Sequence, residues 1–108
     1  MEFNMLFRPV PATTVNLSAS NVSSRVEFLP TATINATDNL LTVRVYNSGT
    51  VVVFINFGGS SVTATTTTSM PMPPGWSEPF RVHPSETYCA GITASGTSTV
   101  YFTVGEGM

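Results

Sequence analysis

The chain contains no lysine, and only 9% of its 108 residues are charged. A typical soluble domain carries about 25% charged residues. The basic residues are four arginines, and serine and threonine supply most of the polar character. A weakly charged surface is easier to desolvate against a partner, and arginine is the cation favoured at protein interfaces. We therefore expect the chain to belong to a protein assembly. Threonine on exposed strand faces is the alternative explanation of this composition.

Other scarcities exclude further classes of function. The net charge is −2 and no basic stripe is present, so nucleic-acid binding is not expected. The single cysteine, Cys89, excludes an intramolecular disulfide. No apolar run approaches the roughly 20 residues of a membrane span, and the acidic, short N-terminal stretch does not resemble a signal peptide. We expect no membrane partner.

The residues that carry most enzyme chemistry are also few. His83 is the only histidine, and although Glu86 and Cys89 follow it closely, no recognisable catalytic signature surrounds the three. Zinc sites use three or four Cys or His ligands, and the six acidic residues are scattered instead of clustered in one loop. The sequence predicts a protein that is not an enzyme and that has no metal site and no cofactor.

Short segments of alternating apolar and polar residues run through the whole chain. Such period-two alternation is typical of half-buried β-strands, and no ten-residue segment has helical periodicity. The sequence predicts an all-β, single-domain jelly roll or β-sandwich of about seven to nine short antiparallel strands. The clearest strands are expected at 14–18, 25–29, 40–46, 51–57, 78–82, 87–93 and 98–104.

Local signals add detail to this plan. Asn47-Ser48-Gly49 is a tight-turn signal, which predicts a β-hairpin of 40–46 with 51–57. A short strand is expected at 33–35, and the threonine-rich stretch 62–68 favours extended backbone. Prolines occupy three of the four positions 71–74, so we expect 70–76 to be a loop.

We divide the chain into an N-terminal arm or edge strand, 1–13, and a β-sandwich domain, 14–108. The arm is apolar for a terminus, and it is either an edge strand of its own sheet or a segment lent to a neighbouring subunit. Trp76 either binds a partner or folds back over the core. Nine residues of the arm and the proline-rich loop are the candidate protein-interface residues: Phe3, Met5, Leu6, Phe7, Arg8, Met70, Met72, Pro74 and Trp76.

The segment from Leu40 to Gly107 carries a distinctive order of motifs. It contains Leu-Leu-x-Val-Arg-Val-x-Asn-Ser-Gly, Val-Phe-Ile-Asn-Phe-Gly, Met-Pro-x-Pro-Pro-Gly, Glu-x-Phe and Ser-Gly-Thr-x-x-Val-Tyr-Phe-Thr-x-Gly-Glu-Gly. This order, which covers roughly two thirds of the chain, resembles capsid cement (decoration) proteins of tailed bacteriophages. The resemblance implies a jelly roll or β-sandwich without catalytic residues. Nothing in the N-terminal third contributes to it.

The resemblance also implies a place and partners. It predicts a virion protein, made in the host cytoplasm, that sits on the outer surface of the capsid. There it would bridge subunits of the major capsid protein and pair with itself as a dimer or trimer. The alternative is a phage tail or fibre component that binds a host receptor or glycan, with Trp76 and Tyr46 as residues that stack on sugars.

Overall fold

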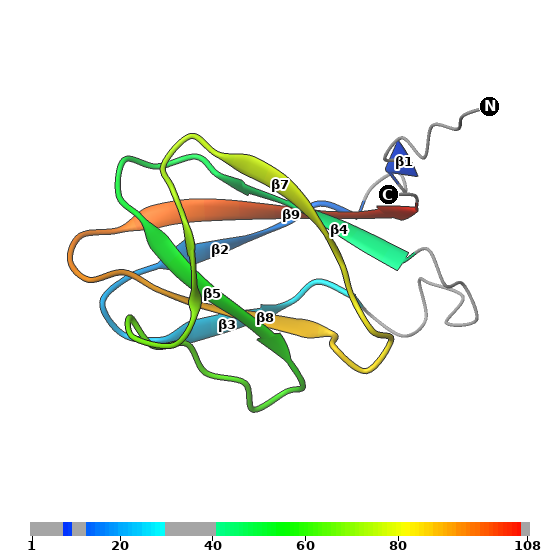
Figure 1. Ribbon diagram of the computed structural model, residues 1–108, viewed down its shortest axis with the longest axis horizontal. Coiled ribbons are helices and arrows are strands. Elements are labelled where there is room, and N and C mark those ends of the chain that lie inside the picture. The colour runs from blue at the N-terminus through cyan, green and yellow to red at the C-terminus, as the bar shows by residue number, and fades with distance from the viewer. Residues whose placement is uncertain (1–7, 10–12, 30–40, 107–108) are drawn as a thin grey trace.

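The computed structural model describes residues 8–9, 13–29 and 41–106, and within these ranges it contains only β-strands and their connections (Figure 1). The strands form two antiparallel sheets. The first sheet contains β1 (Arg8–Pro9), β2 (Val15–Ala19), β9 (Ser98–Glu106), β4 (Leu41–Asn47) and β7 (Ser77–Arg81). The second contains β3 (Ser24–Glu27), β8 (Tyr88–Ile92), β5 (Val53–Gly58) and β6 (Met70–Met72).

The pairing of the strands is nested. β2 pairs with β9, β3 with β8, β4 with β7, and β5 with β6. This is the pattern of one long hairpin whose two arms run side by side. Rolling that hairpin up brings β4 against β9 and β5 against β8, which closes the two sheets. The result is a jelly roll, as the sequence predicts.

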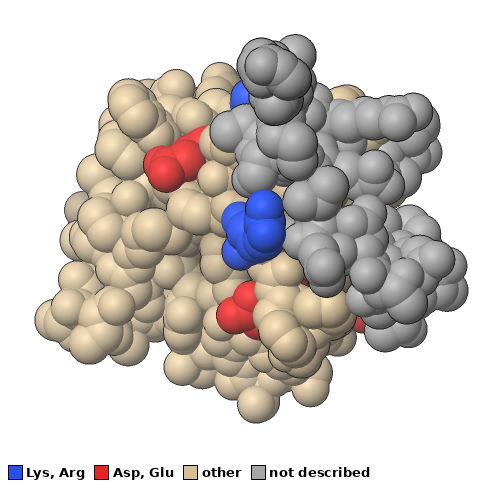
Figure 2. All heavy atoms as spheres, turned by 45° about the vertical axis from the view of Figure 1, so that its right-hand side comes forward, with Lys and Arg blue, Asp and Glu red and all other residues tan. Residues whose placement is uncertain are grey.

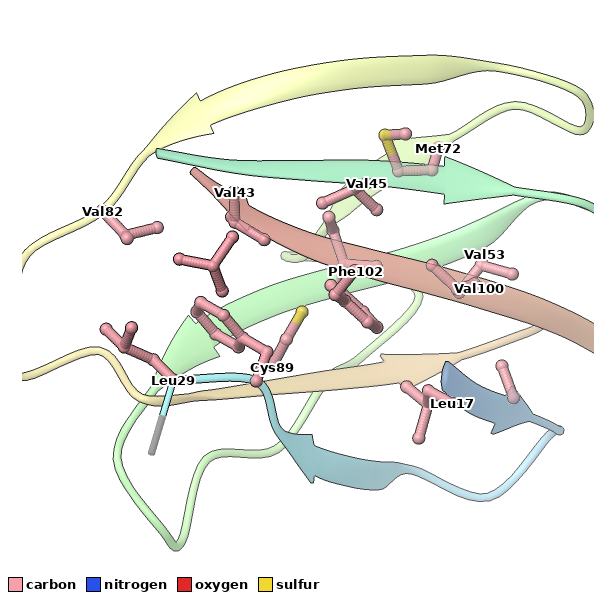
Figure 3. Close-up of a cluster of buried hydrophobic side chains, with 14 residues drawn as sticks. Leu17, Leu29, Val43, Val45, Val53, Met72, Val82, Cys89, Val100 and Phe102 are labelled. Atoms are coloured by element: carbon pink, nitrogen blue, oxygen red, sulfur yellow. The ribbon is translucent and has the colours of Figure 1, made fainter. Parts of the chain in front are cut away.

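The core lies between the two sheets and is filled by the inward-facing residues of each strand (Figure 3). In β4, Val43 and Val45 are fully buried while Arg44 and Tyr46 are exposed, as the alternation predicts. Thr42, which shares the outward phase of Arg44, is buried as well, contrary to that expectation. Phe28 stacks on Phe102 of the opposite sheet, with ring centroids 6.0 Å apart. Aromatic contacts of this kind connect the two layers.

The hairpin expected at Asn47-Ser48-Gly49 is wrong. β4 and β5 do not pair, because β4 lies between β9 and β7 of the first sheet and β5 lies between β8 and β6 of the second. The chain instead crosses from one sheet to the other after Asn47. Alternation reports which face of a strand is buried, but it does not report which strand lies beside it.

Two other local expectations also differ from the structure. Residues 62–68 form turns and coil, in part because the Thr65 hydroxyl accepts a hydrogen bond from the Thr68 amide at 3.1 Å. Such short side-chain bonds compete with extended strand pairing. The first residues of the expected 70–76 loop form the short edge strand β6 despite Pro71. The strand expected at 33–35 lies outside the described residues.

Candidate binding surfaces

The loop between β6 and β7 presents the only tryptophan of the sequence to solvent. Trp76 is 53% exposed and Met70 is 40% exposed, and Pro74 is also exposed. Met72 is 1% exposed, so its assignment to an interface is wrong. The register opposes Met72 to Val53, whose side chain is also buried, and this places the methionine between the sheets (Figure 3).

Backbone hydrogen bonds hold the Trp76 loop in one conformation. Gly75 has a φ of 74°, a left-handed value that favours glycine. Its amide donates to the Asn47 carbonyl at 2.8 Å, and the Asn47 amide donates to the Trp76 carbonyl at 3.0 Å. The Trp76 ring donates from Nε1 to Oε1 of Glu78 at 3.2 Å. The exposed ring is therefore carried by a backbone that these hydrogen bonds hold in place.

The Asn47 side chain anchors this loop from inside the protein. It is fully buried, and its Nδ2 donates to the carbonyls of Val51 and Met72, each at 2.9 Å. Its Oδ1 accepts hydrogen bonds from the Gly49 amide at 3.2 Å and from the Ser98 hydroxyl. The turn signal in the sequence gave no hint of this role, because an exposed turn asparagine and a buried hydrogen-bonding asparagine look alike in sequence.

A second surface lies on the outer face of the first sheet. Tyr46 and Tyr101 are directly opposed in the register, and their rings stack with centroids 6.4 Å apart. They are 42% and 38% exposed. Nearby, Arg44 donates from Nη1 to the Ser77 hydroxyl at 3.2 Å. The sequence singled out Tyr46, whereas Tyr101 was missed, although its outward phase in 98–104 was a signal that could have found it.

Of the three residues considered for catalysis, Cys89 is not brought together with the other two. Cys89 is fully buried in the core, while His83 is exposed in a turn, where its amide donates to Oε1 of Glu86 at 2.8 Å. Burial raises the pKa of the Cys89 thiol strongly, and a hydrogen bond from the Asn56 backbone opposes this shift only in part. The thiol is therefore neither accessible nor ionised near neutral pH.

No three His, Cys, Asp or Glu side chains among the described residues are grouped so that they could hold a metal ion. Within the same part of the chain, no helix has the length and apolar character required to cross a membrane.

Most of the expected N-terminal interface lies outside the described residues. Phe3, Met5, Leu6 and Phe7 are in this group. Arg8 belongs to β1, and the backbone register places it opposite Glu106 at the end of β9. Residues 8–9 are thus a strand at the border of the first sheet.

Comparison with known proteins adds little to these observations. No family model and no curated protein matches the chain. A chain in a solved structure described as "Bacillus endospore appendages form a novel family of disulfide-linked pili" is similar in fold, with 18% sequence identity and a TM-score of 0.47. The likeness covers 96% of this chain and 88% of that chain. A likeness this weak carries no argument about function.

Proposed function

We propose that this chain is a structural subunit of a protein assembly, specifically a capsid cement protein. It binds across subunits of the major capsid protein on the outer surface of a virion head and stabilises the head. The observation that carries the proposal is the display of Trp76, which is 53% exposed on a loop fixed by the buried Asn47. Exposed tryptophans that become buried in a partner's pocket contribute much of the binding free energy of many interfaces.

The rigidity of the loop supports this role. A loop that is ordered before binding loses less conformational entropy on association. Here the Asn47 backbone bonds to Gly75 and Trp76, and its side chain bonds to Met72, so the loop is held at both ends.

The sparse charge of the surface supports the same role. Figure 2 shows one face on which few charged side chains are set among uncharged ones. A surface of this kind is desolvated at low cost when it is covered by a large partner.

The test is the binding of the purified chain to heads of the encoding phage that were assembled without it. Replacing Trp76 with Ala is expected to weaken binding by about 30-fold or more, the effect of losing a residue that dominates an interface. Co-sedimentation of the chain with the heads measures the affinity of each variant for the heads. The melting temperature should change little, because the ring is more than half exposed.

The matched control is Val22→Ala. Val22 is 69% exposed in the turn between β2 and β3, so this variant also removes an exposed apolar side chain. We expect it to bind heads as the unmodified chain does. Equal binding by the Trp76→Ala variant would contradict the proposed role of the loop.

The second candidate, a tail or fibre component that binds a receptor glycan, is favoured by the Tyr46–Tyr101 stack. Two adjacent exposed rings on the outer face of the first sheet offer an aromatic surface for the apolar face of a sugar. The variant Tyr101→Ala separates the two functions. A receptor-binding protein would lose cell or glycan binding in Tyr101→Ala, whereas a cement protein would keep head binding in that variant.

A further inference from the structure

The borders of the two sheets differ in whether they can accept another strand. β7 ends the first sheet on one side and β6 ends the second. Each contains a proline, Pro79 and Pro71, which has no N–H to donate. On the other side, the first sheet ends in β1, which contains Pro9, and β2, and the second ends in β3; β2 and β3 lie close together and contain no proline. Among the strands in the described residues, β2 and β3 are therefore the ones suited to strand addition.

The backbone of β3 offers hydrogen-bonding groups on its free side. The Phe28 amide, just after β3, donates to the carbonyl of Thr87, just before β8, at 3.0 Å. The backbone groups of Phe28 are therefore directed toward the β8 side of β3. Because backbone groups alternate in direction along a strand, Val26 is also directed toward β8. Arg25 and Glu27 therefore direct their N–H and C=O groups to the open border, where β3 lies outside β8 (Figure 3).

The side chains of the same two residues carry opposite charges. Arg25 and Glu27 lie two positions apart on β3, and both are exposed. Residues two apart point to the same face of a sheet. A strand that runs antiparallel to β3 would thus meet a positive and a negative side chain on one face, next to the free backbone groups.

We propose that β3 pairs antiparallel with β3 of a second copy of this chain, with Arg25 of each copy opposite Glu27 of the other. Both residues direct their backbone groups to the open border, so each Arg25–Glu27 pair exchanges two backbone hydrogen bonds. Val26 lies opposite Val26 of the second copy at the two-fold axis. The pairing is isologous and joins the two four-stranded sheets into one continuous sheet.

Charge selects this register over its neighbours. Sliding the second copy by two residues in one direction opposes Arg25 to itself, and sliding it in the other direction opposes Glu27 to itself. Like charges directly opposite one another destabilise a strand pair. A slide of one residue turns the side chains to the wrong faces.

The contact involves a strand of four residues in each copy, so its area is small. An interface of this size is below that of a stable dimer. We expect a weak dimer whose population rises with protein concentration, and which becomes important where an assembly concentrates the chain. The inference does not depend on the identity of the larger partner.

Sedimentation equilibrium of the purified chain, from micromolar to millimolar concentration, tests the proposal. Arg25→Glu places like charges in both pairs and is expected to weaken dimerisation at least tenfold. The double variant Arg25→Glu with Glu27→Arg exchanges the charges and should restore dimerisation. The matched control is Arg81→Glu on the exposed surface of β7, which makes the same change of net charge and should have no effect.

Amide hydrogen exchange gives a second measurement without substitutions. The amides of Arg25 and Glu27 should become protected as concentration rises, while the Val26 amide is protected throughout. The proposal is overturned if the chain stays monomeric at millimolar concentration, or if exchange at Arg25 and Glu27 is independent of concentration. Equal weakening by Arg25→Glu and Arg81→Glu would also overturn it. Each of these failures would leave the head-binding test of Trp76 unaffected.

Discussion

The two borders of the sandwich differ in their chemistry. The β6–β7 border carries Pro71 and Pro79, whereas β2 and β3 on the other side contain no proline. The β6–β7 border also carries Trp76, on the loop that joins its two strands. One border can therefore bind partners through side chains, and the other can bind through its backbone. A small jelly roll can in this way present two different kinds of contact on opposite sides.

The largest expected effect comes from Asn47→Ala, which should loosen the β6–β7 border. The substitution leaves the buried carbonyl of Met72 and the Ser98 hydroxyl without their partner. Unsatisfied buried groups cost roughly 1–3 kcal/mol each, so the free energy of unfolding should fall by about 3 kcal/mol or more. Urea denaturation measures this change.

Ser48→Ala is the control for that substitution. The Ser48 hydroxyl donates to the Thr99 carbonyl at 2.8 Å in an exposed position, so its loss should cost about 0.5 kcal/mol. Hydrogen exchange in Asn47→Ala should accelerate more at Gly75 and Trp76 than at Val26, whose amide should follow only the fall in global stability. Uniform acceleration at both borders would show that the loop has no separate anchor.

Alkaline pH should weaken the core that the two borders share. Burial raises the pKa of the Cys89 thiol, so above about pH 8.5 the unfolded chain loses a proton that the folded chain keeps. The unfolded state then binds fewer protons, and the free energy of unfolding falls by about 1.4 kcal/mol per pH unit from this group. Below pH 8.5 the group has no effect.

Denaturation midpoints between pH 8 and pH 11 test this prediction, with Cys89→Ala as the comparison. The variant loses the contribution of the thiol, so its stability should fall less steeply with pH than that of the unmodified chain. Parallel pH curves for the two proteins would be inconsistent with a buried, protonated thiol.

The smallest effect is expected from Pro79→Thr, which makes the two borders more alike. The Asn47–Trp76 backbone bond sets the alternation along β7, and by this alternation residue 79 faces the open border. Threonine restores an N–H there and favours strand structure. We expect slightly more self-association at high concentration, detected by light scattering, with stability nearly unchanged. An unchanged association state would show that other features protect this border.

The sequence predicted the strands better than their partners. Alternation located the buried Val43 and Val45 and the exposed Arg44 and Tyr46, because the two faces of a strand differ in polarity. It failed at Asn47, where a turn signal was interpreted as a hairpin. Turn chemistry reports a change of direction, and it is the same whether the next strand joins the same sheet or the opposite one.

The candidate surface was predicted in part for a similar reason. Trp76, Met70 and Pro74 were identified by residue type and are exposed, while Met72 has the same residue type as Met70 and is buried. They are two positions apart, so strand phase alone does not distinguish them. Both lie opposite buried residues of β5, Met72 opposite Val53 and Met70 opposite Ile55, and only the structure shows that Met70 is 40% exposed while Met72 is 1% exposed.

The sequence by itself determined that this chain is an all-β jelly roll or sandwich with little surface charge, because strand periodicity and composition are local properties. Only the tertiary structure decided at which strands the absence of proline permits strand addition, because a strand lies at a border only once the strands are ordered in a sheet. It also decided that Asn47 supports the Trp76 loop. That role depends on Val51, Met72 and Ser98, which become neighbours of Asn47 only when the two sheets close.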